Sequence, residues 1–153
     1  VTAADSLSKA YRYLKGEAMV LQNYGYADYL TGDYRNSIGN LYKAIDLFEE
    51  AKDKQGLAKT KMIIAVILFL SETDRERAMD VILEAIDLYH EIGDKRGEAM
   101  ADFNASGGFL RLDRFEEALE YINKYLEITN LIGDNPIITA TAYAVIGNCY
   151  RGT

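Results

Sequence analysis

The sequence predicts an all-α fold built from stacked antiparallel helix pairs, and three observations indicate it. A single Pro and 12 Gly in 153 residues leave long uninterrupted segments, which favours helices over a turn-rich β fold. Residues 62–70, which read Met-Ile-Ile-Ala-Val-Ile-Leu-Phe-Leu, contain no polar side chain. Segments on both sides of this run recur at a spacing of about 40 residues, which is typical of stacked supersecondary units.

The apolar run at 62–70 is the expected centre of the stack. It is too short to cross a bilayer, which needs about 20 apolar residues. Its β-branched side chains would suit a buried strand as well as a helix, and periodicity alone does not decide between the two. The repeated segments on either side favour a helix, and a helix without a polar face must be covered on every side.

Three independent landmarks share one period of 40 or 41 residues. They are Gly16, Gly56 and Gly97; the pairs Asp53-Lys54, Asp94-Lys95 and Asp134-Asn135; and the segments Ala44-Ile45-Asp46-Leu47-Phe48 and Ala85-Ile86-Asp87-Leu88-Tyr89. We expect helices at 17–30, 34–51, 57–71, 75–91, 97–111, 115–131 and 136–151. Residues 5–15 are expected to form a separate helix, the tail of a preceding unit.

These helices give one domain over residues 1–153. Residues 1–16 would be the tail of a preceding repeat or a cap, residues 17–56, 57–96 and 97–135 three repeats, and residues 136–153 the first helix of a further repeat. Because the chain starts with Val1 and in mid-repeat, we expect an excerpt of a longer protein or a processed product. Exposed repeat ends then predict self-association.

Capping residues support the predicted helix ends. The expected start signals are Asp33, Thr73 with Glu76, Asp113 with Glu116, and Pro136 inside the last helix. Gly93 and Gly133 suit the left-handed turn that follows many helices.

The bulk composition excludes several classes of protein. A hydrophobic content of 49% and a charged content of 27% are those of a folded domain. The net charge of −7 argues against nucleic acid as a partner, because no basic field replaces counterions. No signal peptide, membrane span or lipidation motif is present in these residues, so we expect a cytoplasmic protein without a membrane partner.

The repeated units resemble the tetratricopeptide repeat, whose first helix carries aromatic-x2-Leu-Gly-x2-Tyr and whose second carries Ala-x3-Phe-x2-Ala. The matching residues are Leu21, Tyr24, Gly25, Ser37, Leu41 and Ala44; Ala78, Ile82 and Ala85; Phe103, Gly107, Ala118 and Ile122; and Tyr143, Ile146, Gly147 and Tyr150. Val66 and Tyr125 depart from the pattern, since small residues belong there. The period of about 40 residues, against the common ~34, resembles the long-repeat subclass of bacterial signalling regulators.

This resemblance implies a right-handed superhelix, or α-solenoid, that binds a protein or peptide along a groove lined by first helices. It further implies a regulatory or sensory part of a larger bacterial signalling protein. The alternative is a structural scaffold or oligomerisation segment without its own ligand. The expected groove residues are Gln22, Tyr26, Tyr29, Ile63, Ile67, Leu70, Asn104 and Arg111, with Met100 continuing the strip. Flanking units or a second copy could instead cover this apolar strip.

Catalytic residues are not indicated by the sequence. His90 is expected to face solvent or to cap a helix, and Cys149 to be a small buried hydrophobe. No His, Cys and Asp grouping has metal-ligand spacing, so we expect neither a metal nor a cofactor. Most of the 12 tyrosines, such as Tyr24, Tyr89 and Tyr150, are expected at interior packing positions.

Overall fold

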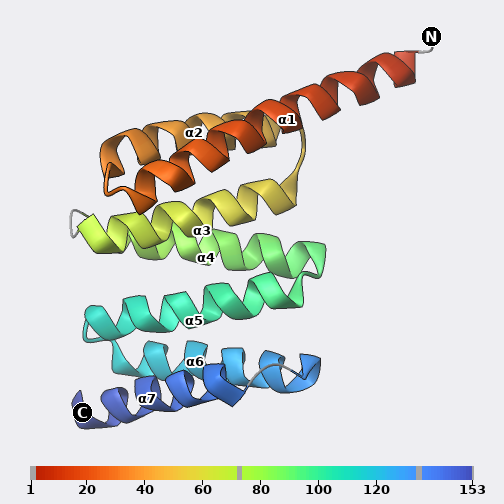
Figure 1. The fold of residues 1–153 in the computed structure, drawn as a ribbon. Helices are drawn as coiled ribbons and strands as arrows, with labels where there is room; N and C mark the ends of the chain where they lie inside the picture. Colours follow the sequence, from red (N-terminus) through yellow and green to blue (C-terminus); the bar gives the residue numbers. More distant parts are fainter. Residues whose placement is uncertain (1–2, 72–73, 134–135, 153) are drawn as a thin grey trace.

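The computed structural model describes residues 3–71, 74–133 and 136–152, without the side chains of residues 3–5 and 136–139. This part of the chain is all-helical, as predicted (Figure 1). Its helices are α1 Ala3–Leu30, α2 Tyr34–Glu50, α3 Lys54–Ser71, α4 Arg75–Ile92, α5 Lys95–Arg111, α6 Phe115–Ile132 and α7 Pro136–Gly152. None of these helices combines the length and the apolar character that a membrane span requires.

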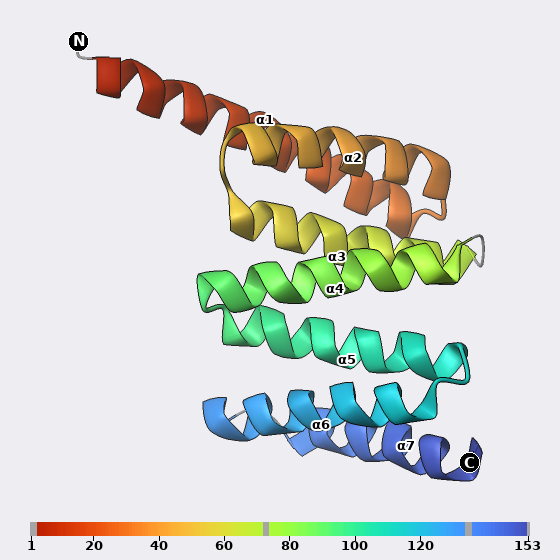
Figure 2. The same ribbon diagram turned by 180° about the vertical axis from the view of Figure 1, so that it is seen from behind.

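The helices are layered in chain order. Figures 1 and 2 show α1 and α2 at one end, then α3 with α4, then α5 with α6, and α7 at the other end. Each helix contacts the next one along the chain, and α1, α3, α5 and α7 also contact one another in sequence. Among the described residues, the alternate helices α2, α4 and α6 make no such contact with one another. Successive helix pairs therefore approach one another more closely on the side of the odd-numbered helices than on the side of the even-numbered ones.

Helix α3 lies at the centre of the hydrophobic core. It contacts α1, α2, α4 and α5, and this explains why its sequence has no polar stripe over 62–70. The main cluster of buried residues includes Leu41, Ile45, Ile64, Ala65, Ile67, Leu68, Phe69, Ala78, Met79, Ile82, Ala105, Phe109, Ala118 and Cys149. These residues come from every helix except α1, so the core runs through the stack rather than forming one centre per pair.

The periodic glycines make room for aromatic rings from the preceding helix pair. A Cβ at Gly56 would lie 2.3 Å from the Phe48 ring, and a Cβ at Gly97 would lie 2.3 Å from the Tyr89 ring. Both rings are buried, with exposed fractions of 1% and 4%. At Gly16 a Cβ would meet nothing within 4 Å. Two of the sequence landmarks therefore meet in one repeated contact: the glycine, and the aromatic residue that ends the segments 44–48 and 85–89.

The third landmark, the Asp-Lys pair, begins the first helix of a unit. The carboxylate of Asp53 accepts a hydrogen bond from the Gly56 backbone N–H at 3.2 Å, and Asp94 accepts one from Gly97 at 3.0 Å. Each Asp is therefore a helix N-cap. Helices α3 and α5 begin at Lys54 and Lys95, earlier than the predicted starts at 57 and 97, because residues expected in the turn form the first helical turn.

Some of the other predicted helix caps are confirmed and one is wrong. Asp33 caps α2 as expected, and Gly93 and Gly133 adopt the left-handed conformation, both with φ of 72°. The Asp113 cap prediction is wrong, because Asp113 itself has a φ of 56° and Arg114 precedes α6 without a side-chain cap. Thr73 lies outside the described residues, and the neighbouring Asp74 caps α4 by accepting from the Arg77 N–H at 3.1 Å.

Helix α1 corrects the expectation of two helices before residue 30. It is continuous from Ala3 to Leu30 and passes through Gly16 without a break. The Asp-Lys cap that starts α3 and α5 is missing from this part of the sequence, so no signal ends one helix and begins another. As a result the N-terminal half of α1 projects beyond the stack (Figure 1).

The tyrosines are less buried than their pattern predicts. Tyr89 is in the core as expected, but Tyr24 is 61% exposed and Tyr150 is 69% exposed, so the prediction is wrong for these two. Tyr24 follows Gln22 and precedes Gly25, both buried on the packed face of α1. A helix turns by about 100° per residue, and Tyr24 is thereby left on a face that no described helix covers.

Gly97→Ala is expected to lower the free energy of unfolding by about 1–3 kcal/mol, the usual cost of overpacking a core. The added methyl group would meet the buried Tyr89 ring. Gly39→Ala is the matched control, because a Cβ there meets nothing within 4 Å. Improved helix propensity should raise its stability by about 0.5–1 kcal/mol. Urea denaturation compares the two variants, and a Gly97→Ala protein as stable as Gly39→Ala would contradict the packing argument.

Candidate functional site

An apolar groove crosses the first helices of three successive pairs and encloses about 480 Å³. We call it the α1–α3–α5 groove. It is lined by Gln22, Asn23, Tyr26 and Tyr29 from α1, by Lys59, Met62, Ile63 and Val66 from α3, and by Met100 and Asn104 from α5. Among these described lining residues, Lys59 is the one with a charged side chain. The groove therefore offers apolar and aromatic surface together with amide groups.

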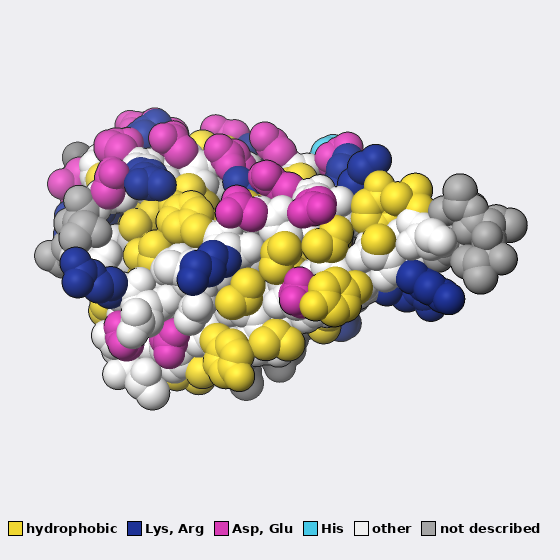
Figure 3. All heavy atoms as spheres, turned by 90° about the horizontal axis from the view of Figure 1, so that it is seen from above, with side chains coloured by type: hydrophobic (Ala, Val, Ile, Leu, Met, Phe, Trp, Pro, Cys, Tyr) yellow, Lys and Arg dark blue, Asp and Glu magenta, His cyan; other side chains and the backbone are white. Residues whose placement is uncertain are grey.

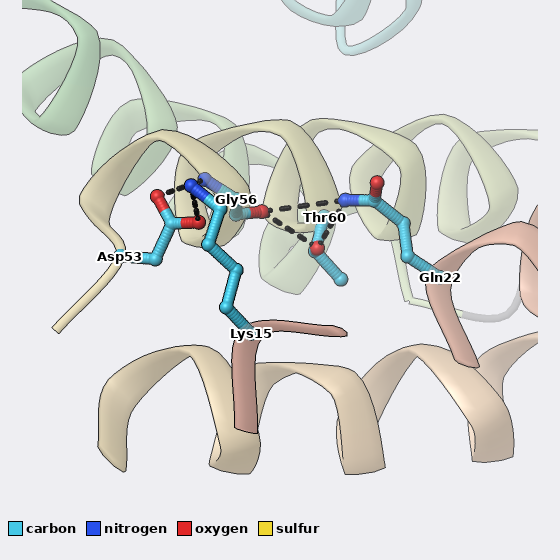
Figure 4. Close-up of polar contacts among 5 residues, drawn as sticks. All are labelled: Lys15, Gln22, Asp53, Gly56 and Thr60. Atoms are coloured by element: carbon cyan, nitrogen blue, oxygen red, sulfur yellow. Dashed lines mark hydrogen bonds and ion pairs between the residues drawn. The ribbon is translucent and has the colours of Figure 1, made fainter. Parts of the chain in front are cut away.

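Polar contacts hold α1 against α3 at one wall of the groove (Figure 4). The Gln22 Nε2 donates to Thr60 Oγ1 at 2.7 Å, and the Thr60 hydroxyl donates to the Gly56 carbonyl at 2.7 Å. Lys15 Nζ lies 2.7 Å from the Asp53 carboxylate, near the start of α3. Because Gln22 is 6% exposed and already bonded, it positions the wall of the groove and offers little to a ligand.

Tyrosines form the α1 side of the groove. The rings of Tyr26 and Tyr29 have centroids 5.9 Å apart, and Tyr29 stacks on Tyr34 of α2 at 6.3 Å. Tyr34 is partly buried against the main core, so this chain of rings connects the groove to the hydrophobic interior. Tyr26 is 47% exposed and is the most accessible of the three. An exposed aromatic ring braced by others is a typical anchor for a binding partner.

Ile67 does not line the groove, contrary to the sequence prediction. It is fully buried and belongs to the main core cluster. At about 100° per residue, Ile67 lies only about 40° around the helix from Ile63, at the edge of the groove face, and the packing of the main core covers it there. The residues of α3 that face the groove are instead at positions 59, 62, 63 and 66, the i, i+3, i+4, i+7 spacing of one helix face.

Leu70 and Arg111 lie outside the groove as well. Leu70 is 45% exposed and lies one turn beyond Val66 on α3. Arg111 is exposed and lies seven residues beyond Asn104, about 10 Å along α5 at 1.5 Å per residue. The amide of Asn104 borders the groove, where its Nδ2 donates to the Met100 carbonyl of its own helix at 2.9 Å. The groove is therefore shorter than the predicted strip.

The structure brings together Gln22, Tyr26, Tyr29, Ile63 and Asn104 from the predicted set, and also the expected Met100. Sequence reasoning missed Asn23, Lys59, Met62 and Val66. For the three residues of α3, the signal available in the sequence was their helical spacing relative to Ile63. The run 62–70 has no polar face, however, so the sequence does not show which side of this helix faces the groove.

The two residues considered for chemistry in the sequence, His90 and Cys149, lie in ordinary surface and core positions. The His90 side chain is 71% exposed, and its Nδ1 lies 3.0 Å from Glu98. Cys149 is buried as predicted, and burial raises the pKa of its thiol. In the described ranges, no group of three or more His, Cys, Asp or Glu side chains is placed to hold a metal ion.

Asp102 of α5 is a buried acid that sequence reasoning did not single out. It is 2% exposed, and its Oδ1 has no hydrogen-bond partner in the described part of the chain. Burial raises the pKa of Asp102 to about 7, and the charge of Glu98 acts in the same direction, whereas Lys124 and Lys95 act against it. Its position between the small residues Ala101 and Ala105 was the signal available in the sequence.

Ile67→Ala is expected to destabilise the protein by about 2–5 kcal/mol, because it leaves a cavity in the core. Tyr26→Ala should change the stability far less, since nearly half of that side chain is exposed. Thermal unfolding followed by circular dichroism measures both. A Tyr26→Ala protein that melts as early as Ile67→Ala would show that Tyr26 is a core residue and not a free groove residue.

Asp102→Asn is expected to flatten the dependence of stability on pH between about 4 and 7. In the native chain the folded pKa is near 7 and the unfolded pKa is about 3.9, so folding favours the protonated acid. The stability that the protonated Asp102 side chain gives the folded protein, relative to the charged one, is fully present below pH 4 and is lost as the pH rises through 7. The shift corresponds to at most about 4 kcal/mol. Unfolding curves of both proteins from pH 4 to 8 measure it, and parallel curves would contradict the burial effect.

The resemblance to a repeat family depends on residues of this chain alone. No family model matches the sequence, and no curated protein matches it either. The period, the Gly–aromatic contacts and the groove on the odd-numbered helices are therefore the features from which a function is argued.

Proposed function

We propose that this chain is a tetratricopeptide-like module that binds a protein or peptide segment in the α1–α3–α5 groove and catalyses no reaction. The observation that carries the proposal is the groove itself, which is apolar, partly exposed and built by the first helices of three successive pairs. Helical repeats commonly bind partners on an extended surface to which each repeat contributes similar positions.

The arrangement of contacts supports a superhelix with its concave side on α1, α3, α5 and α7, and the resemblance implies that it is right-handed. These helices contact one another in sequence, whereas α2, α4 and α6 do not in the described part of the stack. A stack that is closer along one side curves toward that side, because each unit is rotated slightly against the last. The groove would then lie on the concave surface.

The lining residues favour a partner with apolar or aromatic side chains. Tyr26 and Met100 are 47% and 57% exposed on opposite sides of the groove, so a bound side chain would bury both. A thioether adapts its shape to different partners, and an aromatic ring supplies a large contact area. Lys59 borders the same space and would favour an acidic group beside the apolar anchor.

The proposed setting is a regulatory or sensory part of a larger bacterial signalling protein in the cytoplasm. It follows from the resemblance to long-repeat regulators, and a repeat fold by itself does not specify a function.

A scaffold or oligomerisation segment is the second candidate, and the surface of α1 favours it. Figure 3 shows hydrophobic side chains gathered on the face formed by α1 and α2. Among the exposed large hydrophobic residues of α1 are Tyr13, Val20 and Tyr24, each more than half exposed, and their spacing of seven and four residues places them on one face of the helix. Such a patch is typical of a contact surface. Self-association through it would make the molar mass measured by light scattering rise with concentration.

Tyr26→Ala combined with Met100→Ala is expected to weaken peptide binding by roughly thirtyfold, which corresponds to about 2 kcal/mol for a central aromatic anchor. The ligand is the best peptide selected from a random display library on the native protein, and fluorescence anisotropy gives its Kd. Tyr24→Ala is the matched control, an exposed tyrosine of the same helix outside the groove. Equal affinity for the double variant and the native protein would contradict the groove as the binding site. If Tyr24→Ala self-associates as strongly as the native protein does, the second candidate is weakened.

A further inference from the structure

A second cavity, of about 450 Å³, lies between α4, α5 and α6. We call it the α4–α6 cavity. It is lined by Ile86, Asp87, His90, Lys95, Glu98, Asp102, Tyr121, Lys124, Glu127, Ile128 and Leu131. At about 100° per residue, Lys95, Glu98 and Asp102 occupy nearly the opposite face of α5 from Met100 and Asn104. The cavity is therefore independent of the α1–α3–α5 groove.

Asp102 is the feature of this cavity that the fold does not account for. It borders the cavity at 2% exposure, and within the described residues its Oδ1 has no hydrogen-bond partner. A buried carboxyl group without a partner costs free energy, and native proteins satisfy nearly all such groups. Oδ1 itself is closed off from solvent, so a partner inside the cavity would meet the carboxyl group through its other oxygen and offset the charge that the two oxygens share.

The basic side chains nearby are already engaged with other acids. Glu98 receives Lys95 Nζ at 2.7 Å on one carboxylate oxygen and His90 Nδ1 at 3.0 Å on the other. Lys124 Nζ lies 2.6 Å from Glu120 on its own helix. These contacts leave Asp102 without a cation of its own.

The titratable groups that face Asp102 come from all three helices. Asp87 and His90 belong to α4, Lys95 and Glu98 to α5, and Tyr121, Lys124 and Glu127 to α6. With Asp102 included, four acids and two lysines line the cavity, so it repels an anion and attracts a cation. Ile86, Ile128 and Leu131 add apolar surface beside these charges. In the part of the chain that the structure describes, no three-ligand group for a metal ion is present.

We propose that the α4–α6 cavity binds a protonated primary amine on a short aliphatic chain, with the ammonium group at the Asp102 carboxylate. An ammonium group supplies both a positive charge and three hydrogen-bond donors. The aliphatic chain lies against Ile86, Ile128 and Leu131. A free small amine and a lysine side chain of another protein share this chemistry.

The first test uses n-butylammonium on the full chain at pH 8, where Asp102 is ionised. Isothermal titration calorimetry gives the affinity, and the carbon-13 shift of the Asp102 carboxyl group reports contact at that residue. Saturable binding and a lowered Asp102 pKa are expected. Asp102→Asn should weaken binding at least tenfold, whereas Asp46→Asn, an exposed acid on α2 outside the cavity, should not. Circular dichroism verifies that both variants are folded.

The dependence on pH supplies an independent readout. An alkylammonium stays charged to about pH 10, so Asp102 sets the dependence below pH 8. Affinity should fall by about tenfold per pH unit below 7, as the carboxyl group becomes protonated. The neutral n-butanol should not bind.

Two results would overturn the proposal. One is no Asp102 shift up to about 50 mM n-butylammonium, well above the millimolar range expected for so small a ligand. The other is equal binding by Asp102→Asn and the native protein. The peptide acetyl-Gly-Lys-Gly-amide distinguishes the two sources: affinity at least equal to that of n-butylammonium indicates a lysine side chain, and weaker binding indicates a free amine.

Discussion

Complete burial of α3 is the constraint on which the rest of the structure depends. A helix whose residues 62–70 are all apolar needs neighbours on every side, and α1, α2, α4 and α5 supply them. Because α1 and α5 both pack against α3, their exposed edges come together on one side of it. The α1–α3–α5 groove lies where those edges meet. The same burial that stabilises the fold therefore also creates its candidate binding surface.

Close approach between helix pairs explains why the sequence repeats as it does. The ring of Phe48 occupies the space that a side chain at Gly56 would need, and Tyr89 does the same at Gly97. In α3 and α5 the capping Asp lies three residues before that glycine, so cap and close contact are parts of one short motif. A period of 40 or 41 residues is thus maintained by one contact geometry.

Helix α5 presents different chemistry on its two sides. Met100 and Asn104 face the apolar groove, whereas Glu98 and Asp102 face the acidic α4–α6 cavity. Glu98 keeps its charge: burial acts to raise its pKa, but the hydrogen bonds from Lys95 and His90 lower it overall. Asp102, one turn further on, has no such partners and its pKa rises. The two acids differ because one is paired and the other is only buried.

The all-helical fold, the order of the helices and most of the helix ends could be predicted from the sequence, because these depend on local spacing and caps. Which residues of α3 face the groove depends on the helices that pack around it. A helix apolar on every side carries no mark of its orientation, so Ile67 was assigned to the groove although it lies in the core. Neighbouring helices likewise decide that Tyr24 is exposed and Asp102 unpaired, since burial depends on segments distant in the chain.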